Sequence, residues 1–407
     1  MLAYSAGIWK VGLIPQAIAN GLASILVLFF LLSGLNGSLM DVGLVTGASA
    51  LALIPSQVFW GRMVDSKGRC KPFLIVGFLG MGVSFFAIPF AGTVAELLVL
   101  VSLKSVLYAA TLPARQLLTV ESERREGWKK GLANMQFLSS SGETIGMGVG
   151  ALTIATLGFG QLFFLCGALS VVSALALGVL AREPGIMIQR KLVAMERSTD
   201  TLVAMSDLAG RSKTVASMAA YDRVVGMLNQ STKFLMLGIF TFSLAGNAFY
   251  SPLPAFFLKF YSSSSVLAVF FGSSLAGAVC YLVVGRMGKS VGKNLVLAAT
   301  TRMVMIPMLV LAALGASPGL ALAVGVLAVL ETMWSVFDVS STFAYLERAQ
   351  VGKAGIYGAA VGLGSAGGAF MGGLVSQQFG FGALFGLCSV LCAITLTSFA
   401  IQFKNLR

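Results

Sequence analysis

Five charged side chains interrupt stretches of sequence that are otherwise apolar. They are two bases and three acids: Lys104, Glu143, Arg302, Glu331 and Asp338. An ionisable group at bilayer depth is costly, usually faces a cavity or another charge, and marks the path of a solute, ion or proton. Because the chain has no histidine, any proton carried at this depth must be carried by the carboxylates. Glu331 and Asp338 are seven residues apart and therefore share one face of a helix.

Long apolar helices are needed to hold such charges. Of the 407 residues, 57% are apolar and 11% are charged, against about 25% charged in a soluble domain. At about 20 residues per span, the composition suffices for about twelve transmembrane helices. Without histidine, Ser-His-Asp catalysis and HExxH metal sites are excluded, and none of the five cysteines forms a CxxC pair. We therefore expect no enzymatic activity, no cofactor and no metal site.

The apolar stretches fall into two groups of six. They lie at 13–35, 42–60, 72–91, 94–115, 131–156 and 162–180, and then at 234–258, 266–284, 295–314, 320–343, 355–375 and 384–401. The sequence therefore predicts an all-α membrane protein with a six-helix bundle at 1–181 and a second at 234–407. The cytoplasmic linker at 182–233 is either an amphipathic helix on the membrane surface or a solvated connector.

The net charge of +13 is distributed asymmetrically between the predicted loops. Nearly all lysines and arginines fall on the side that also holds both termini and the linker. This distribution follows the positive-inside rule and places that side in the cytoplasm. We therefore expect a multi-pass protein of the plasma (inner) membrane with cytoplasmic termini, in contact with the lipid bilayer and not with nucleic acid.

The two halves repeat each other. GRMVDSKGR at 61–69 aligns with GRMGKSVGK at 285–293, an offset of 224 residues. Further along, one set of three glycines matches another: Gly142, Gly146 and Gly150 with Gly364, Gly368 and Gly372. Since each half has six spans, the halves are parallel repeats. For these glycines we favour close helix packing of the small-xxx-small type.

The loop between the second and third spans carries a motif formed by Gly61, Asp65, Gly68, Arg69 and Lys71. Its glycines permit tight turns, and Pro72 suits the first turn of the next helix. With the span count and the long linker, this motif resembles the major facilitator superfamily of secondary transporters. The resemblance implies that Asp65 and Arg69 join an inner-face charge network that locks the outward-open state. It further implies that Asp65 faces the N-terminal end of span 11, where a helix dipole favours an anion.

The same resemblance places Lys104 where proton-coupled exporters carry an arginine in span 4. Six further polar or aromatic residues are candidates for lining a central cavity: Asn20, Tyr108, Gln136, Asn247, Tyr250 and Trp334. The segment 247–254 is expected to be broken, because Pro252 and Pro254 remove backbone hydrogen bonds. In a purely structural alternative, Lys104 pairs with Glu143 and Arg302 with Glu331, or Arg302 reaches the inner interface by snorkelling.

These features predict a secondary active transporter that moves a small organic solute by alternating access. Protons or another ion would drive it, and we favour proton-coupled export over a proton-coupled uptake symporter. A membrane sensor or scaffold that has lost transport is the alternative from a different class. We expect the protein to act as a monomer.

We expect Asp65→Asn to slow transport and to depopulate the outward-open state, because the neutral side chain no longer joins the charge network. Transport rate and accessibility of the inner face, measured on the same preparation, check this. Unchanged rates and state populations would remove Asp65 from the gate.

Overall fold

The computed structural model describes residues 8–122, 128–181, 233–284, 291–315, 319–348 and 354–404. Every regular element within these ranges is a helix. The predicted linker at 182–233 lies, apart from its last residue, outside the described residues.

Each predicted span corresponds to a helix or to two or three consecutive helical segments. The first half contains η1 (Ile8–Leu13), α1 (Ile14–Phe29), η2 (Phe30–Gly34), α2 (Leu39–Lys67), α3 (Lys71–Ala87), η3 (Ile88–Phe90), α4 (Val94–Ala109), α5 (Thr111–Ser122), α6 (Trp128–Thr153) and α7 (Phe159–Leu180). The second half contains α10 (Lys233–Tyr250), α11 (Leu253–Leu258), α12 (Ser263–Val284), α13 (Val291–Gly315), α14 (Leu320–Arg348), α15 (Ala354–Gln378) and α16 (Gly380–Lys404).

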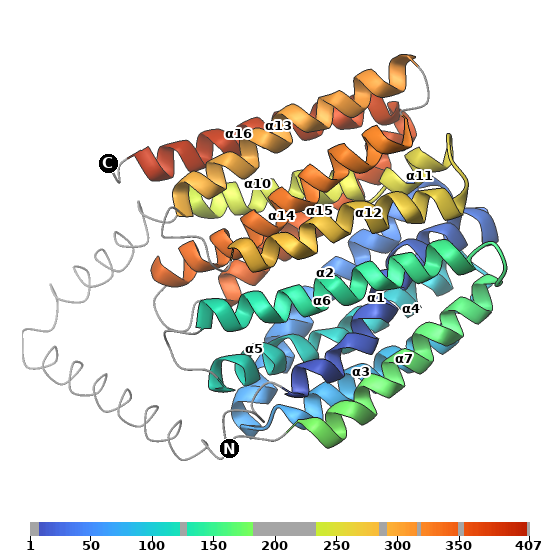
Figure 1. Cartoon of the computed structure of the whole chain (residues 1–407), viewed down its shortest axis with the longest axis vertical. Coiled ribbons are helices and arrows are strands. Elements are labelled where there is room, and N and C mark those ends of the chain that lie inside the picture. Colours follow the sequence, from blue (N-terminus) through green and yellow to red (C-terminus); the bar gives the residue numbers. More distant parts are fainter. Residues whose placement is uncertain are drawn as a thin grey trace, which may run out of the picture.

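Ten of these spans are long and apolar enough to cross a membrane by themselves, with α4 and α5 counted together. The other two, α6 and α13, are 26 and 25 residues long, which also suffices for about 30 Å of hydrocarbon. Successive spans run in opposite directions, so that α1 begins and α16 ends at the same end of the bundle (Figure 1). We call this the inner end and the opposite one the outer end. The twelve-helix prediction is confirmed.

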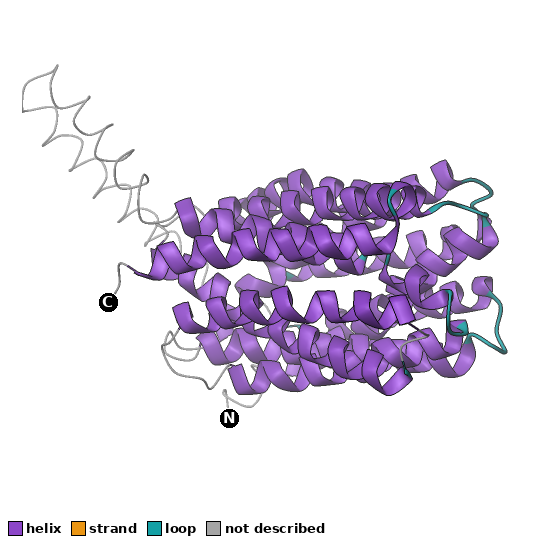
Figure 2. Cartoon of the chain, turned by 90° about the horizontal axis from the view of Figure 1, so that it is seen from above, coloured by secondary structure: helices purple, strands orange, loops and turns teal. Residues whose placement is uncertain are grey.

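The helices pack in the same pattern in both halves. In the first half α1 contacts α6 and α7, α3 contacts α4 and α7, and α2 contacts α4. In the second half α10 contacts α15 and α16, α13 contacts α14 and α16, and α12 contacts α14. Between the halves, α2 packs on α15 and α6 on α12, and Figure 2 shows the two groups of helices side by side. The predicted parallel repeats are confirmed.

The matched glycines hold the helices together. A Cβ atom on Gly146 of α6 would overlap the backbone carbonyl oxygen of Ile18 in α1. In the second half, a Cβ atom on Gly368 of α15 would overlap the carbonyl oxygen of Leu244 in α10. Only glycine permits this approach of two backbones. The interpretation of these glycines as packing residues is confirmed.

The loop after α2 agrees only in part with the sequence analysis. Gly68 ends α2 with a φ of +63°, and Pro72 lies in the first turn of α3. The turn expected at Gly61 is wrong: α2 continues through it to Lys67, and a Cβ atom there would meet nothing within 4 Å. The side chain of Asp65 lies outside the described part of the chain, so its place in a charge network stays a prediction.

Two spans are interrupted. The break expected at 247–254 is confirmed, because α10 ends at Tyr250 and α11 begins at Leu253 after Pro252. A second break, which sequence reasoning missed, falls at Ala110 between α4 and α5. Four of the five cysteines, Cys70, Cys166, Cys388 and Cys392, pack in the hydrophobic core.

We predict that Gly146→Ala and Gly368→Ala each lower the thermal unfolding temperature of the purified protein. An added methyl group that meets a backbone carbonyl forces two helices apart, which costs about 1–3 kcal/mol. The matched control is Gly386→Ala in α16, where a Cβ atom meets nothing within 4 Å. This control should leave stability unchanged or raise it by up to about 1 kcal/mol through helix propensity. Equal effects at all three positions would contradict the packing argument.

Candidate functional site

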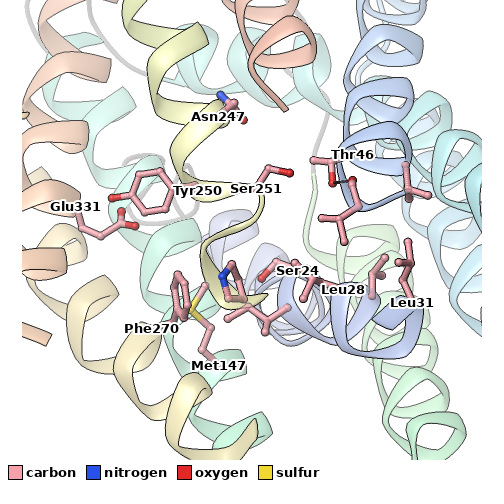
Figure 3. Close-up of a pocket in the computed structure, with 15 residues that line it drawn as sticks. Ser24, Leu28, Leu31, Thr46, Met147, Asn247, Tyr250, Ser251, Phe270 and Glu331 are labelled. Carbon is pink, nitrogen blue, oxygen red and sulfur yellow. Dashed lines mark hydrogen bonds between the residues drawn. The ribbon is translucent and has the colours of Figure 1, made fainter. Parts of the chain in front are cut away.

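A cavity of about 270 Å³ lies between the two halves. Its walls come from α1, α2 and α6 of the first half and from α10, α11, α12 and α14 of the second (Figure 3). Most lining side chains are apolar, and the polar ones are Ser24, Thr46, Asn247, Tyr250, Ser251 and Glu331. Glu331 is the one charged residue among those that line the cavity. Ser251 belongs to the break between α10 and α11, so the cavity touches the interrupted span.

Arg302 of α13 is enclosed by aromatic rings behind this cavity. It is 1% exposed, and its Cζ atom lies 4.4 Å from the ring centre of Phe242, 5.1 Å from that of Trp334 and 5.7 Å from that of Tyr250. Cation–π contacts stabilise a guanidinium that has lost its water. Its Nε and Nη2 atoms make no hydrogen bond to a described residue. The snorkelling alternative is therefore wrong, because the side chain is confined inside the second half.

Tyr250 lies between Arg302 and Glu331. Its ring contributes to the enclosure of Arg302, and its hydroxyl is directed towards the Glu331 carboxylate (Figure 3). That hydroxyl makes no hydrogen bond of ordinary geometry within the described part of the chain. Arg302 and Glu331 act on each other electrostatically without forming an ion pair.

The ion pairs of the purely structural alternative, between Lys104 and Glu143 and between Arg302 and Glu331, are not formed among the described residues. The Lys104 ammonium instead lies 5.5 Å from the ring centre of Phe85. Glu143 lies within electrostatic range of Arg115, Glu331 and Lys104, which belong to both halves. Its backbone is held against α1, because a Cβ atom on Gly21 would overlap it. Charges from the two repeats therefore surround one fixed carboxylate.

Asp338 connects the halves on the inner side of Glu331. Its Oδ2 atom accepts hydrogen bonds from Nε2 of Gln136 at 3.0 Å and from the hydroxyl of Tyr281 at 3.2 Å. Gln136 lies on α6 of the first half, whereas Tyr281 lies on α12 of the same half as Asp338. Asp338 is ten residues, or about 15 Å, from the inner end of α14. The Gln136–Asp338 hydrogen bond therefore closes the inner side of the interface.

Three candidates from the sequence remain to be placed. Asn247 lines the cavity and donates a hydrogen bond to Ser365 at 2.9 Å. Trp334 stacks on Phe242 beside Arg302. Asn20 accepts a hydrogen bond from Gln16 within α1 at 3.3 Å.

Sequence reasoning missed Arg115. It donates a hydrogen bond to the hydroxyl of Tyr108 at 2.9 Å, and its Nε atom is buried without a partner among the described residues. It acts electrostatically on Glu143. Arg115 is the last residue of the predicted stretch 94–115, whereas in the structure α5 continues to Ser122. Pro113, two residues earlier, was the signal that a new helix begins here.

Comparisons with known proteins place this geometry in context. Residues 11–355 match the family model described as Major Facilitator Superfamily. The multidrug efflux pump Tap of Mycolicibacterium fortuitum is 32% identical over 158 residues, which cover 36% of this chain and 38% of that pump. The alignment thus spans well under half of that relative.

Two solved structures share the fold. A mutant of the nucleoside transporter NupG superposes with a TM-score of 0.68 at 13% identity, covering 99% of this chain and 100% of that one. Another NupG structure gives a TM-score of 0.64 at 15% identity, covering 99% of each chain. At such low identity the likeness concerns the fold alone.

We predict that Gln136→Leu loosens the inner end, whereas Tyr281→Phe does so far less. Each change removes one hydrogen bond to the same carboxylate oxygen, but only the first bond joins the halves. A hydrogen bond to a charged group contributes about 1.5–3 kcal/mol, so the opened population should rise about tenfold or more. Amide hydrogen exchange at the inner ends of α6 and α14 measures this in nanodiscs. Equal acceleration in both variants would argue against a latch between the halves.

Proposed function

Because the chain belongs to the Major Facilitator Superfamily, we propose that it is a proton-coupled transporter that exports a small organic solute by alternating access. The observation that carries this proposal is the cavity between the repeats, which is lined by one carboxylate, that of Glu331. On the inner side of Glu331, the Gln136–Asp338 hydrogen bond joins the two halves. A multi-pass transporter of this family moves a small molecule across a membrane. The direction of transport, the driving ion and the alternating-access mechanism belong to our proposal.

The packing supports alternating access. Within each half, glycines bring helix backbones into contact. The halves meet along the pairs α2–α15 and α6–α12, which are related by the repeat, and glycines also bring α2 and α15 together. Two bodies with two equivalent interfaces can rock about the cavity between them. We propose that 1–181 and 234–407 are these bodies, that 182–233 is a cytoplasmic linker, and that a monomer suffices.

The arrangement of acids supports proton coupling. Asp338 accepts two hydrogen bonds, one of them from the other half. Protonation removes the charge that strengthens these bonds and so weakens the inner latch. Further inward along α14, the hydroxyl of Ser341 lies 2.9 Å from that of Tyr357, which extends a polar path from Asp338 towards the inner end. Proton release to the inner side would then restore the latch.

Export is favoured over uptake by the similarity to the efflux pump Tap, although it covers only part of either chain. We place the inner end in the cytoplasm of a plasma membrane, since the basic loops lie there. The test is a thermal-shift screen of compound classes on purified protein, followed by proteoliposome flux of each hit under an imposed pH gradient. Gradient-driven efflux supports export, proton-stimulated uptake supports a symporter, and binding without flux supports a sensor.

We predict that Glu143→Gln and Asp338→Asn abolish gradient-driven accumulation while solute exchange continues. The amides keep the shape and hydrogen-bonding capacity of the carboxylates but cannot take up and release the proton. The ratio of accumulated to exchanged solute in proteoliposomes measures this. Glu96→Gln, at the exposed outer end of α4, is the matched control and should behave as the unmodified protein. Uphill transport retained in every carboxylate variant would eliminate the proposed coupling.

A further inference from the structure

The cavity combines an apolar wall with one acid. Nine of its lining residues are Ile25, Val27, Leu28, Leu31, Val42, Val45, Met147, Pro254 and Phe270. Against this wall stands the Glu331 carboxylate, with Asn247 and Tyr250 as neutral polar neighbours (Figure 3). Such a surface favours a solute that has an apolar body and one group of opposite charge to Glu331.

Glu331 lacks a counter-charge in direct contact. It forms no ion pair with a described residue, and its neighbours are the Tyr250 hydroxyl, which is directed towards it, and Arg302, which acts on it electrostatically. A carboxylate taken out of water is costly unless it is paired. Asp338 on the same helix, by contrast, accepts hydrogen bonds from Gln136 and Tyr281 and does not line the cavity.

The positive charge that acts on Glu331 is that of Arg302, whose guanidinium is already enclosed by aromatic rings. The guanidinium is held by Phe242, Trp334 and Tyr250. It does not line the cavity. It therefore acts on the Glu331 carboxylate at a distance and leaves the part of that carboxylate that faces the cavity open to a second cation.

We propose that the substrate of this cavity is an organic cation with an apolar body, and that its charge replaces Arg302 as the counter-charge of Glu331. The inference rests on the proposed transport function and names the substrate class of the same site. A solute that binds here competes electrostatically with a cation built into the protein. The cavity of about 270 Å³ lies at the lower end of ligand pockets, about 300–1,000 Å³, which limits the apolar body to a small one.

The first test compares three probes of one size on the full chain in nanodiscs by titration calorimetry. They are benzyltrimethylammonium with a permanent positive charge, its uncharged carbon isostere neopentylbenzene, and the anion 3-phenylpropanoate. We expect the cation to bind about tenfold or more tightly than either alternative, since only it pairs with the carboxylate. Equal or tighter binding of the neutral or anionic probe overturns the proposal, as does failure of the cation to bind.

The second test uses variants at the two charges. Glu331→Gln should weaken cation binding about tenfold or more, whereas the matched surface variant Glu96→Gln should leave it unchanged. Arg302→Gln should strengthen cation binding, because the competing charge is gone, and Arg302→Lys should not. Unchanged affinity in Glu331→Gln overturns the proposal. If Arg302→Gln does not fold, Glu331→Gln still decides: the preference for the cation should be lost in Glu331→Gln and kept in Glu96→Gln.

Flux measurements separate this inference from the transport function on which it rests. If neutral or anionic hits from the compound screen are transported under a pH gradient, transport stands and the cation assignment fails. If the cation binds in a Glu331-dependent manner without flux, the cation site stands and transport fails.

Discussion

The cost of holding charges in an apolar bundle is the constraint on which the arrangement of this protein depends. Three of the mid-membrane charges are compensated in different ways: Arg302 by aromatic rings, Asp338 by two hydrogen bonds, and Lys104 by a ring at one face. Among the residues that line the cavity, only Glu331 carries a charge, and it forms no ion pair with a described residue. The way each charge is stabilised therefore separates groups that hold the structure together from the group that is available to a solute.

Glycines bring helix backbones together both within the halves and between them. The contacts of α1 with α6 and of α10 with α15 bring backbones together at Gly146 and Gly368, and α2 and α15 of opposite halves meet at Gly43 and Gly373. Such interfaces cannot slide or open without losing dispersion contacts along the helix. The hydrogen bond between Gln136 and Asp338 breaks at a much smaller cost. It is therefore the weaker of the two kinds of contact that join the repeats.

The sequence predicted the helices well because span length, apolar composition and proline positions act locally. The break before Leu253 and the packing role of Gly146 both follow from short-range patterns. The site was harder, since it depends on how helices are rotated against one another. Gln136 and Asp338 are 202 residues apart, and nothing in either local sequence indicates their bond. The surroundings of Arg302 were unpredictable for the same reason: the rings that enclose it come from two other helices, α10 and α14.

Tyr250 connects the charge of the site to the part of the fold that is interrupted. It is the last residue of α10, directly before the break; its ring contacts Arg302, and its hydroxyl is directed towards Glu331. A change of angle between α10 and α11 moves this ring and alters how strongly the two charges act on each other. Conversely, a cation at Glu331 changes the force on the ring. The same side chain therefore responds both to the charge in the cavity and to the shape of the broken span, which is the physical requirement for coupling substrate binding to a change of conformation.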